Sequence, residues 1–129
     1  MGVRETVTNE GGVQNCEMVL VVFRGEYDLA SKQRLRQEFA ALVDEASVVL
    51  DFSDVGYFDS TMIEELVWLR NAREAAGLER ATLVLNNPSL LRILEMLDLG
   101  KFLQVVPSLD DVIGRDGRPV RVRYAQMDD

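Results

Sequence analysis

The chain has 129 residues, a net charge of −8 at neutral pH and no histidine. The acidic excess argues against nucleic acid as a partner, because phosphate neutralisation needs clustered lysine and arginine. The lack of histidine removes the commonest general base and the commonest metal ligand. No apolar run approaches the ~18 residues of a membrane helix, the start does not resemble a signal peptide, and the single cysteine cannot form an internal disulfide, so we expect a cytosolic protein.

The first third of the chain predicts two strands and a helix. Weak alternation over Arg4–Thr8 predicts a first strand, which we expect to pair antiparallel at a sheet edge. The continuous apolar run Met18–Phe23 predicts a central strand buried on both faces and ended by Arg24–Glu26. Apolar residues at helical spacing predict a helix over Ser31–Ala46, with Ser31 as its N-cap.

The middle of the chain predicts a second strand and a long helix. Val48–Phe52 is a second buried strand, and a short acidic loop follows it. Strong periodicity predicts a helix over Thr61–Ala76. Thr61 and Glu64 have the spacing of a capping box, which would leave Ser60 exposed just outside the helix.

The last third predicts two more strand and helix pairs. Ala81–Leu85 is a third buried strand, and Asn87-Pro88 then starts a helix with proline at its first position. Phe102–Val106 predicts a short last strand, and Pro107-Ser108 begins a brief final helix. Strands that alternate with amphipathic helices imply parallel pairing through right-handed crossovers.

The sequence therefore predicts an α/β fold: a single layer of mostly parallel strands, an antiparallel edge strand and about four helices. We expect one domain over residues 1–129, with a core at about 13–113 and a C-terminal extension at 114–129. In that extension Val120, Val122 and Tyr124 alternate with arginines. The alternation fits an extra strand, at an edge or against a partner, and a frayed tail fits equally well.

The acidic residues and the serine of the middle segment raise the question of whether the chain is an enzyme. Asp51, Asp54 and Asp59 could gather around Mg²⁺, as in a phosphoaspartate receiver, but the late lysine, Lys101, precedes its strand instead of following it. Ser60 has no histidine to activate it, and the chain contains no Walker loop. We therefore expect no enzyme activity, no metal and no cofactor.

What remains is an exposed hydroxyl at a helix start, where backbone N–H groups and the helix dipole favour an anion. Ser60 would then be modified by another protein. A phosphate there would stand beside Asp59, Glu64 and Glu65. Adding ~1.5 to 2 negative charges at this position would change how a partner docks more than it would change the fold.

The chain resembles the STAS domain, the module of sulfate transporters and anti-sigma factor antagonists. Three motifs carry this resemblance, and together they span roughly residues 13–113 in the right order. They are Arg24–Ala30, with its Gly-Glu-x-Asp segment; Val48–Val55 followed by Phe58–Thr61, the strand and phosphorylation loop; and Leu83–Pro88 with Leu94 and Leu97–Leu99, the third crossover.

The resemblance implies a STAS-like fold and a partner-switching function in bacterial transcription regulation, of the kind used in stress response and sporulation. The unmodified protein would bind an anti-sigma factor that is also a serine kinase, and sigma factor would be released. The kinase would phosphorylate Ser60 and the complex would separate, and a serine phosphatase would reset the switch. Asp28, Asp59, Thr61, Met62 and Glu64 would belong to the partner-binding surface.

One departure from the family pattern is Met62, where members usually carry glycine. Met62 would either alter the docking surface or pack into the core. A second function therefore stays open: an interaction module without the switch, such as a signalling scaffold or the soluble subunit of a lipid transporter. The lack of a long apolar run predicts no membrane contact, and the sequence leaves the oligomeric state open.

Overall fold

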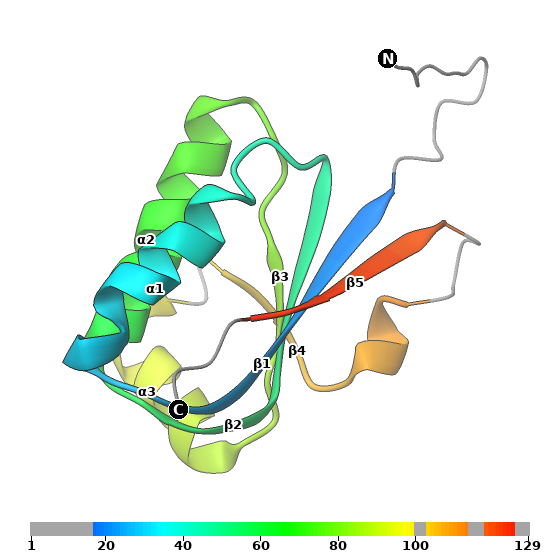
Figure 1. Cartoon of the computed structure of the whole chain (residues 1–129). Helices are drawn as coiled ribbons and strands as arrows, with labels where there is room; N and C mark the ends of the chain where they lie inside the picture. Colours follow the sequence, from blue (N-terminus) through cyan, green and yellow to red (C-terminus); the bar gives the residue numbers. More distant parts are fainter. Residues whose placement is uncertain (1–16, 100–102, 114–117, 126–129) are drawn as a thin grey trace, which may run out of the picture.

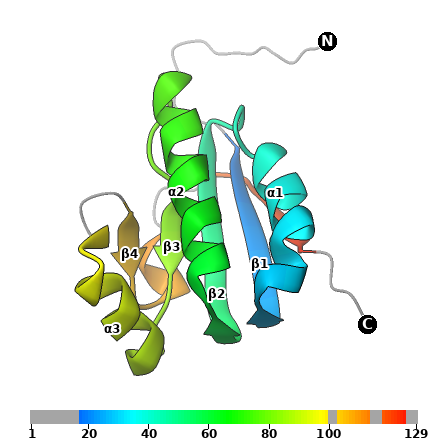
Figure 2. The ribbon, with the colours of Figure 1, turned by 90° about the vertical axis from the view of Figure 1, so that its left-hand side faces the viewer.

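A computed structural model describes residues 17–99, 103–113 and 118–125. They form one five-stranded sheet with strand order β4-β3-β2-β1-β5. The three α-helices cover one face of this sheet (Figures 1 and 2). The predicted α/β class is confirmed, and every strand pair in the described ranges is parallel. The predicted antiparallel strand at Arg4–Thr8 lies outside the described residues.

The two central strands are longer than predicted. β1 spans Met18–Tyr27 and β2 spans Ser47–Phe58. The prediction that β1 ends at Arg24–Glu26 is wrong, and so is the acidic loop predicted after β2. Both strands continue because their backbones pair in parallel as far as Tyr27 opposite Phe58, through two register shifts. The polar side chains of these stretches are mostly exposed, so they leave the pairing intact.

The helices begin and end at identifiable signals. A 3₁₀ turn, η2 (Leu29–Ser31), leads into α1 (Lys32–Ala40), which is shorter than the predicted helix. Ser31 precedes α1 but makes no side-chain cap to it, since its Oγ accepts a hydrogen bond from the Asp28 N–H at 3.2 Å. α2 spans Ser60–Ala75 and α3 spans Pro88–Met96, with proline at the first position as predicted.

The remaining elements complete the sheet. β3 is Thr82–Val84, β4 is Gln104–Val106 and β5 is Val120–Tyr124. The predicted final helix is only a 3₁₀ turn, η4 (Leu109–Asp111), which lies on the sheet face opposite the α-helices (Figure 1).

The strand interpretation of residues 120–124 is confirmed, because β5 pairs in parallel with β1. Two ion pairs fix β5 to the α1–β2 region. Arg123 binds Glu38 of α1, and Arg121 binds Glu45 at 2.8 Å.

The main core lies between the sheet and the three helices. Its centre is a chain of edge-to-face aromatic contacts in which ring centroids are 4.9 to 6.1 Å apart. The rings belong to Phe23, Tyr27, Phe39, Phe52 and Phe58. Tyr27 and Phe58 are the last paired residues of β1 and β2, so the core extends to the carboxyl ends of both strands. Burial raises the pKa of the Tyr27 phenol above its ordinary value.

Arg73 of α2 is fully buried beside this core. Its guanidinium donates to the backbone carbonyls of Leu42 at 2.8 Å and Glu45 at 2.6 Å. It also donates to the carbonyls of Ala46 at 3.3 Å and Glu79 at 2.9 Å. Burial lowers the pKa of Arg73, although an arginine side chain stays charged in proteins. One side chain thus ties α2 to the loop between α1 and β2 and to the loop between α2 and β3.

Candidate functional site

The candidate site lies where β1 and β2 end side by side, which we call the carboxyl edge. Figure 2 shows both arrowheads at the same end of the sheet, with α1 and α2 leading back from it. Asp28 follows the last paired residue of β1, and Asp59 follows that of β2. The backbone N–H of Asp59 donates to the Tyr27 carbonyl at 3.3 Å, so the two connections are tied together.

Each aspartate caps the helical segment that follows its strand. The Asp28 carboxylate accepts from the Ala30 N–H at 3.0 Å, and the Asp59 carboxylate accepts from the Thr61 N–H at 2.8 Å. The sequence assigned the second cap to Thr61 with Glu64, and that assignment is wrong. Asp59 is the N-cap of α2, and Ser60 is the first residue of the helix instead of lying outside it.

Ser60 is exposed at this first helical position. The positive end of the helix dipole is concentrated there, and it favours a negatively charged group. Glu64 is also exposed, one helical turn further along α2. Ser60, Asp28, Asp59 and Glu64 thus lie at the carboxyl edge or within the first two turns of α2 next to it.

Thr61 and Met62 lie differently from the other predicted site residues. Thr61 is 5% exposed and Met62 is 0% exposed, and Met62 is a member of the main core. Of the two alternatives for Met62, packing into the core agrees with the structure. A side chain in that position does not reach the surface, so the expectation that Met62 contacts a partner directly does not fit this conformation.

We expected Glu65 to stand beside a phosphate on Ser60, but the structure gives its carboxylate another role. Its carboxylate is 1% exposed and binds the Arg36 guanidinium through two hydrogen bonds, of 2.5 and 3.2 Å. Arg36 also lies over the Trp68 ring, 4.3 Å from its centroid. The group joins α1 to α2, and the charge of Glu65 is already matched there.

Two large apolar side chains at the carboxyl edge were not among the predicted site residues. Leu29 is 71% exposed and directly follows Asp28, and Tyr57 is 48% exposed and lies two residues before Asp59. Leu29 lies inside the first STAS motif, directly after the aspartate that caps η2. An apolar residue at that point was the sequence signal that could have marked Leu29 as a surface contact.

We expect Asp59→Ala to lower the free energy of unfolding by about 1 kcal/mol, since it removes the acceptor for a helix N–H. Asp59→Asn should retain most of the stability, because asparagine caps equally well without the charge. Urea denaturation followed by Trp68 fluorescence would measure both. Wild-type stability of Asp59→Ala would contradict the assignment of the cap.

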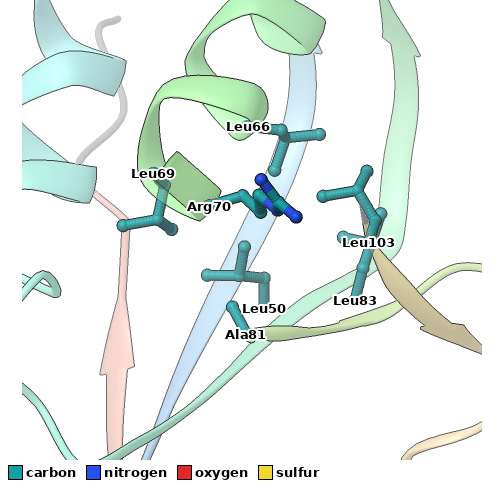
Figure 3. Close-up of a pocket in the computed structure, with 7 residues that line it drawn as sticks. All are labelled: Leu50, Leu66, Leu69, Arg70, Ala81, Leu83 and Leu103. Carbon is teal, nitrogen blue, oxygen red and sulfur yellow. The ribbon is translucent and has the colours of Figure 1, made fainter. Parts of the chain in front are cut away.

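The small cavity under α2 offers no site for a ligand. Its volume is about 10 Å³, about enough for one water molecule. Figure 3 shows that leucines line it and that the Arg70 side chain lies across it. The Arg70 guanidinium is paired with Glu74 at 2.6 Å. This cavity is a packing defect of the core.

No group of three or more acidic, thiol or imidazole residues that could hold a metal ion is found among the residues that the structure describes. The Asp51 carboxylate accepts instead from the Ser53 N–H at 3.0 Å and hydroxyl at 2.6 Å. The aspartates of the receiver-like alternative therefore do not come together. In the same part of the chain, no helix has the length and apolar character needed to cross a membrane.

The fold is that of a STAS domain. The family model "Mlab, STAS domain" matches residues 14–107, and the chain belongs to this family. No curated protein matches the sequence.

Solved structures of anti-sigma factor antagonists share the fold. A putative one from Thermotoga maritima is 17% identical, with a TM-score of 0.63, covering 71% of this chain and 84% of its own. One from Mycobacterium paratuberculosis is 22% identical, with a TM-score of 0.60, covering 86% and 94%. The phosphorylated form of Bacillus SpoIIAA, a cell fate determinant, is 17% identical, with a TM-score of 0.57, covering 74% and 87%.

Proposed function

We propose that the chain is an anti-sigma factor antagonist controlled by phosphorylation of Ser60. In its unmodified form it binds an anti-sigma factor that is also a serine kinase, and sigma factor is released in the bacterial cytoplasm. The observation that carries this proposal is the position of Ser60, an exposed hydroxyl that opens α2 directly after a capping aspartate. The chain supplies the substrate hydroxyl, and the kinase supplies ATP and the catalytic groups.

The electrostatics of the carboxyl edge support a switch that acts on binding instead of folding. A phosphate at the first position of α2 interacts favourably with the helix dipole, by about 0.3 to 1 kcal/mol. The same phosphate adds ~1.5 to 2 negative charges beside Asp28, Asp59 and Glu64. The fold would keep its stability while the charge that a partner meets would change strongly.

Two further observations support the proposal. The chain has the fold of anti-sigma factor antagonists, and one of the similar structures, SpoIIAA, was solved in a phosphorylated form. A serine phosphatase would return the phosphorylated protein to its binding form.

Phosphorylation by purified anti-sigma serine kinases tests the site. We expect one phosphate per chain by intact mass, located on Ser60 by peptide mapping, and none on Ser60→Ala. Ser89→Ala is the matched control, because Ser89 is also exposed and lies in the first turn of α3. Undiminished phosphorylation of Ser60→Ala would remove Ser60 from the proposal.

A second candidate is an interaction module without the switch, either a signalling scaffold or the soluble subunit of a lipid transporter. The matching family model is described as "Mlab, STAS domain", a description that does not separate switching from non-switching members. This second candidate predicts a stable complex with a partner protein and no phosphate on the purified chain. Co-purification followed by mass spectrometry of both proteins separates it from the first candidate.

A further inference from the structure

The two helical segments at the carboxyl edge start in equivalent ways. Tyr27 is paired with Phe58, and in each connection an aspartate N-cap comes next. The residue after the cap opens a helical segment, and it is Leu29 in one connection and Ser60 in the other. Neighbouring strands lie about 4.8 Å apart. Leu29 and Ser60 therefore hold equivalent positions, each two residues beyond a paired strand end, on neighbouring connections.

The exposure of Leu29 is fixed by its surroundings. Asp28 forms a capping box with Ser31, in which the Asp28 carboxylate accepts from the Ala30 N–H and the Ser31 hydroxyl accepts from the Asp28 N–H. This turn holds Leu29 with 71% of its surface in solvent. An apolar side chain held out in this way is ready to enter a partner's pocket without losing backbone entropy on binding.

Tyr57 extends the apolar surface on the β2 side. Its neighbour Phe58 is buried in the core under the helices, so strand alternation directs Tyr57 to the opposite, outer side. Tyr57 is 48% exposed and lies opposite Glu26 in the strand register. Leu29 and Tyr57 therefore flank the end of the β1–β2 pair from which Ser60 emerges.

Four carboxylates lie on the same strand ends, helix caps and first two helical turns as these two side chains. We call them the acidic rim, and they are Glu26, Asp28, Asp59 and Glu64. Lys32, in the first turn of α1, is the nearest exposed cation in sequence to Leu29. An apolar centre inside a charged border is the arrangement found at protein interfaces. Charge complementarity requires a partner whose apolar pocket is bordered by lysine and arginine.

We infer that Leu29 and Tyr57 are the apolar anchors by which the anti-sigma kinase docks on the unmodified protein, with basic residues of the kinase facing the acidic rim. This inference rests on the proposed function. Docking on the anchors would place the Ser60 hydroxyl at the contact. A phosphate on Ser60 would add charge next to the apolar pocket of the kinase. Removing water from that phosphate on binding would be costly.

Titration calorimetry with a purified anti-sigma serine kinase tests the anchors, with Leu29→Ser and Tyr57→Thr as the variants. We expect each variant to bind about tenfold more weakly or worse, as for central interface residues. Both side chains are exposed, so thermal unfolding midpoints should match the wild type. Met96→Ser is the matched control, because Met96 is 75% exposed at the end of α3, and it should bind like the wild type.

The outcomes separate the anchors from the function. Wild-type binding by both Leu29→Ser and Tyr57→Thr would overturn the anchors and leave the proposed function standing. Failure of the unmodified wild type to bind any anti-sigma kinase would overturn the proposed function and the anchors with it. Loss of binding by Met96→Ser as well would also overturn the anchors, since the effect would then not be specific to the carboxyl edge.

Discussion

Arg73→Met should lower the free energy of unfolding by roughly 3–5 kcal/mol, a large part of the total for a domain of this size. The methionine fills most of the space but donates no hydrogen bonds. Four backbone carbonyls, three in the loop before β2 and one in the loop before β3, would lose the guanidinium that they bind. A buried polar group without a partner costs about 1–3 kcal/mol.

Two further variants separate this effect from a loss of positive charge. Arg73→Lys keeps the charge but has a single nitrogen, which cannot reach all four carbonyls, so we expect an intermediate loss of stability. Arg92→Met removes an exposed arginine from α3 and should change the stability by less than about 0.5 kcal/mol. Urea denaturation with matched m-values measures all three. A similar small change for Arg73→Met and Arg92→Met would show that the buried hydrogen bonds contribute little.

Ser60→Asp should weaken binding to the anti-sigma kinase by roughly 30-fold or more, which corresponds to about 2 kcal/mol. The substitution adds a permanent negative charge beside Leu29 and within the acidic rim. Ser60→Ala adds no charge and should keep the wild-type affinity. Phosphorylated wild type should bind at least as weakly as Ser60→Asp, because a phosphate carries more charge than a carboxylate.

The stability of Ser60→Asp is its internal control. An aspartate at the first position of α2 interacts favourably with the helix dipole, so the thermal midpoint should be unchanged or slightly higher. Ser89→Asp introduces the same charge in the first turn of α3, away from the carboxyl edge, and should leave kinase binding unchanged. Equal binding by Ser60→Asp and wild type would exclude a charge-based switch at this residue.

The sequence determined the elements whose signals are local. Continuous apolar runs predicted both central strands, and proline predicted the start of α3. Alternating apolar and charged residues indicated that β5 could form. The motif Phe58–Thr61 also predicted that Ser60 lies at a helix start. The reason is that both of its neighbours, Asp59 and Thr61, are residue types that cap helices. These features depend on residues that lie close together in the sequence, so they can be predicted from the sequence alone.

The tertiary structure decided what depends on contacts across the chain. β1 and β2 continue through polar residues because each provides the backbone partner of the other. Glu65 is buried because Arg36, from a different helix, compensates its charge. Arg73 is buried because the α1–β2 loop and the α2–β3 loop offer it carbonyls. Leu29 and Ser60 hold equivalent positions at one sheet edge only because strand pairing aligns two separate connections. Such pairings join residues about 30 positions apart, and no local pattern records them.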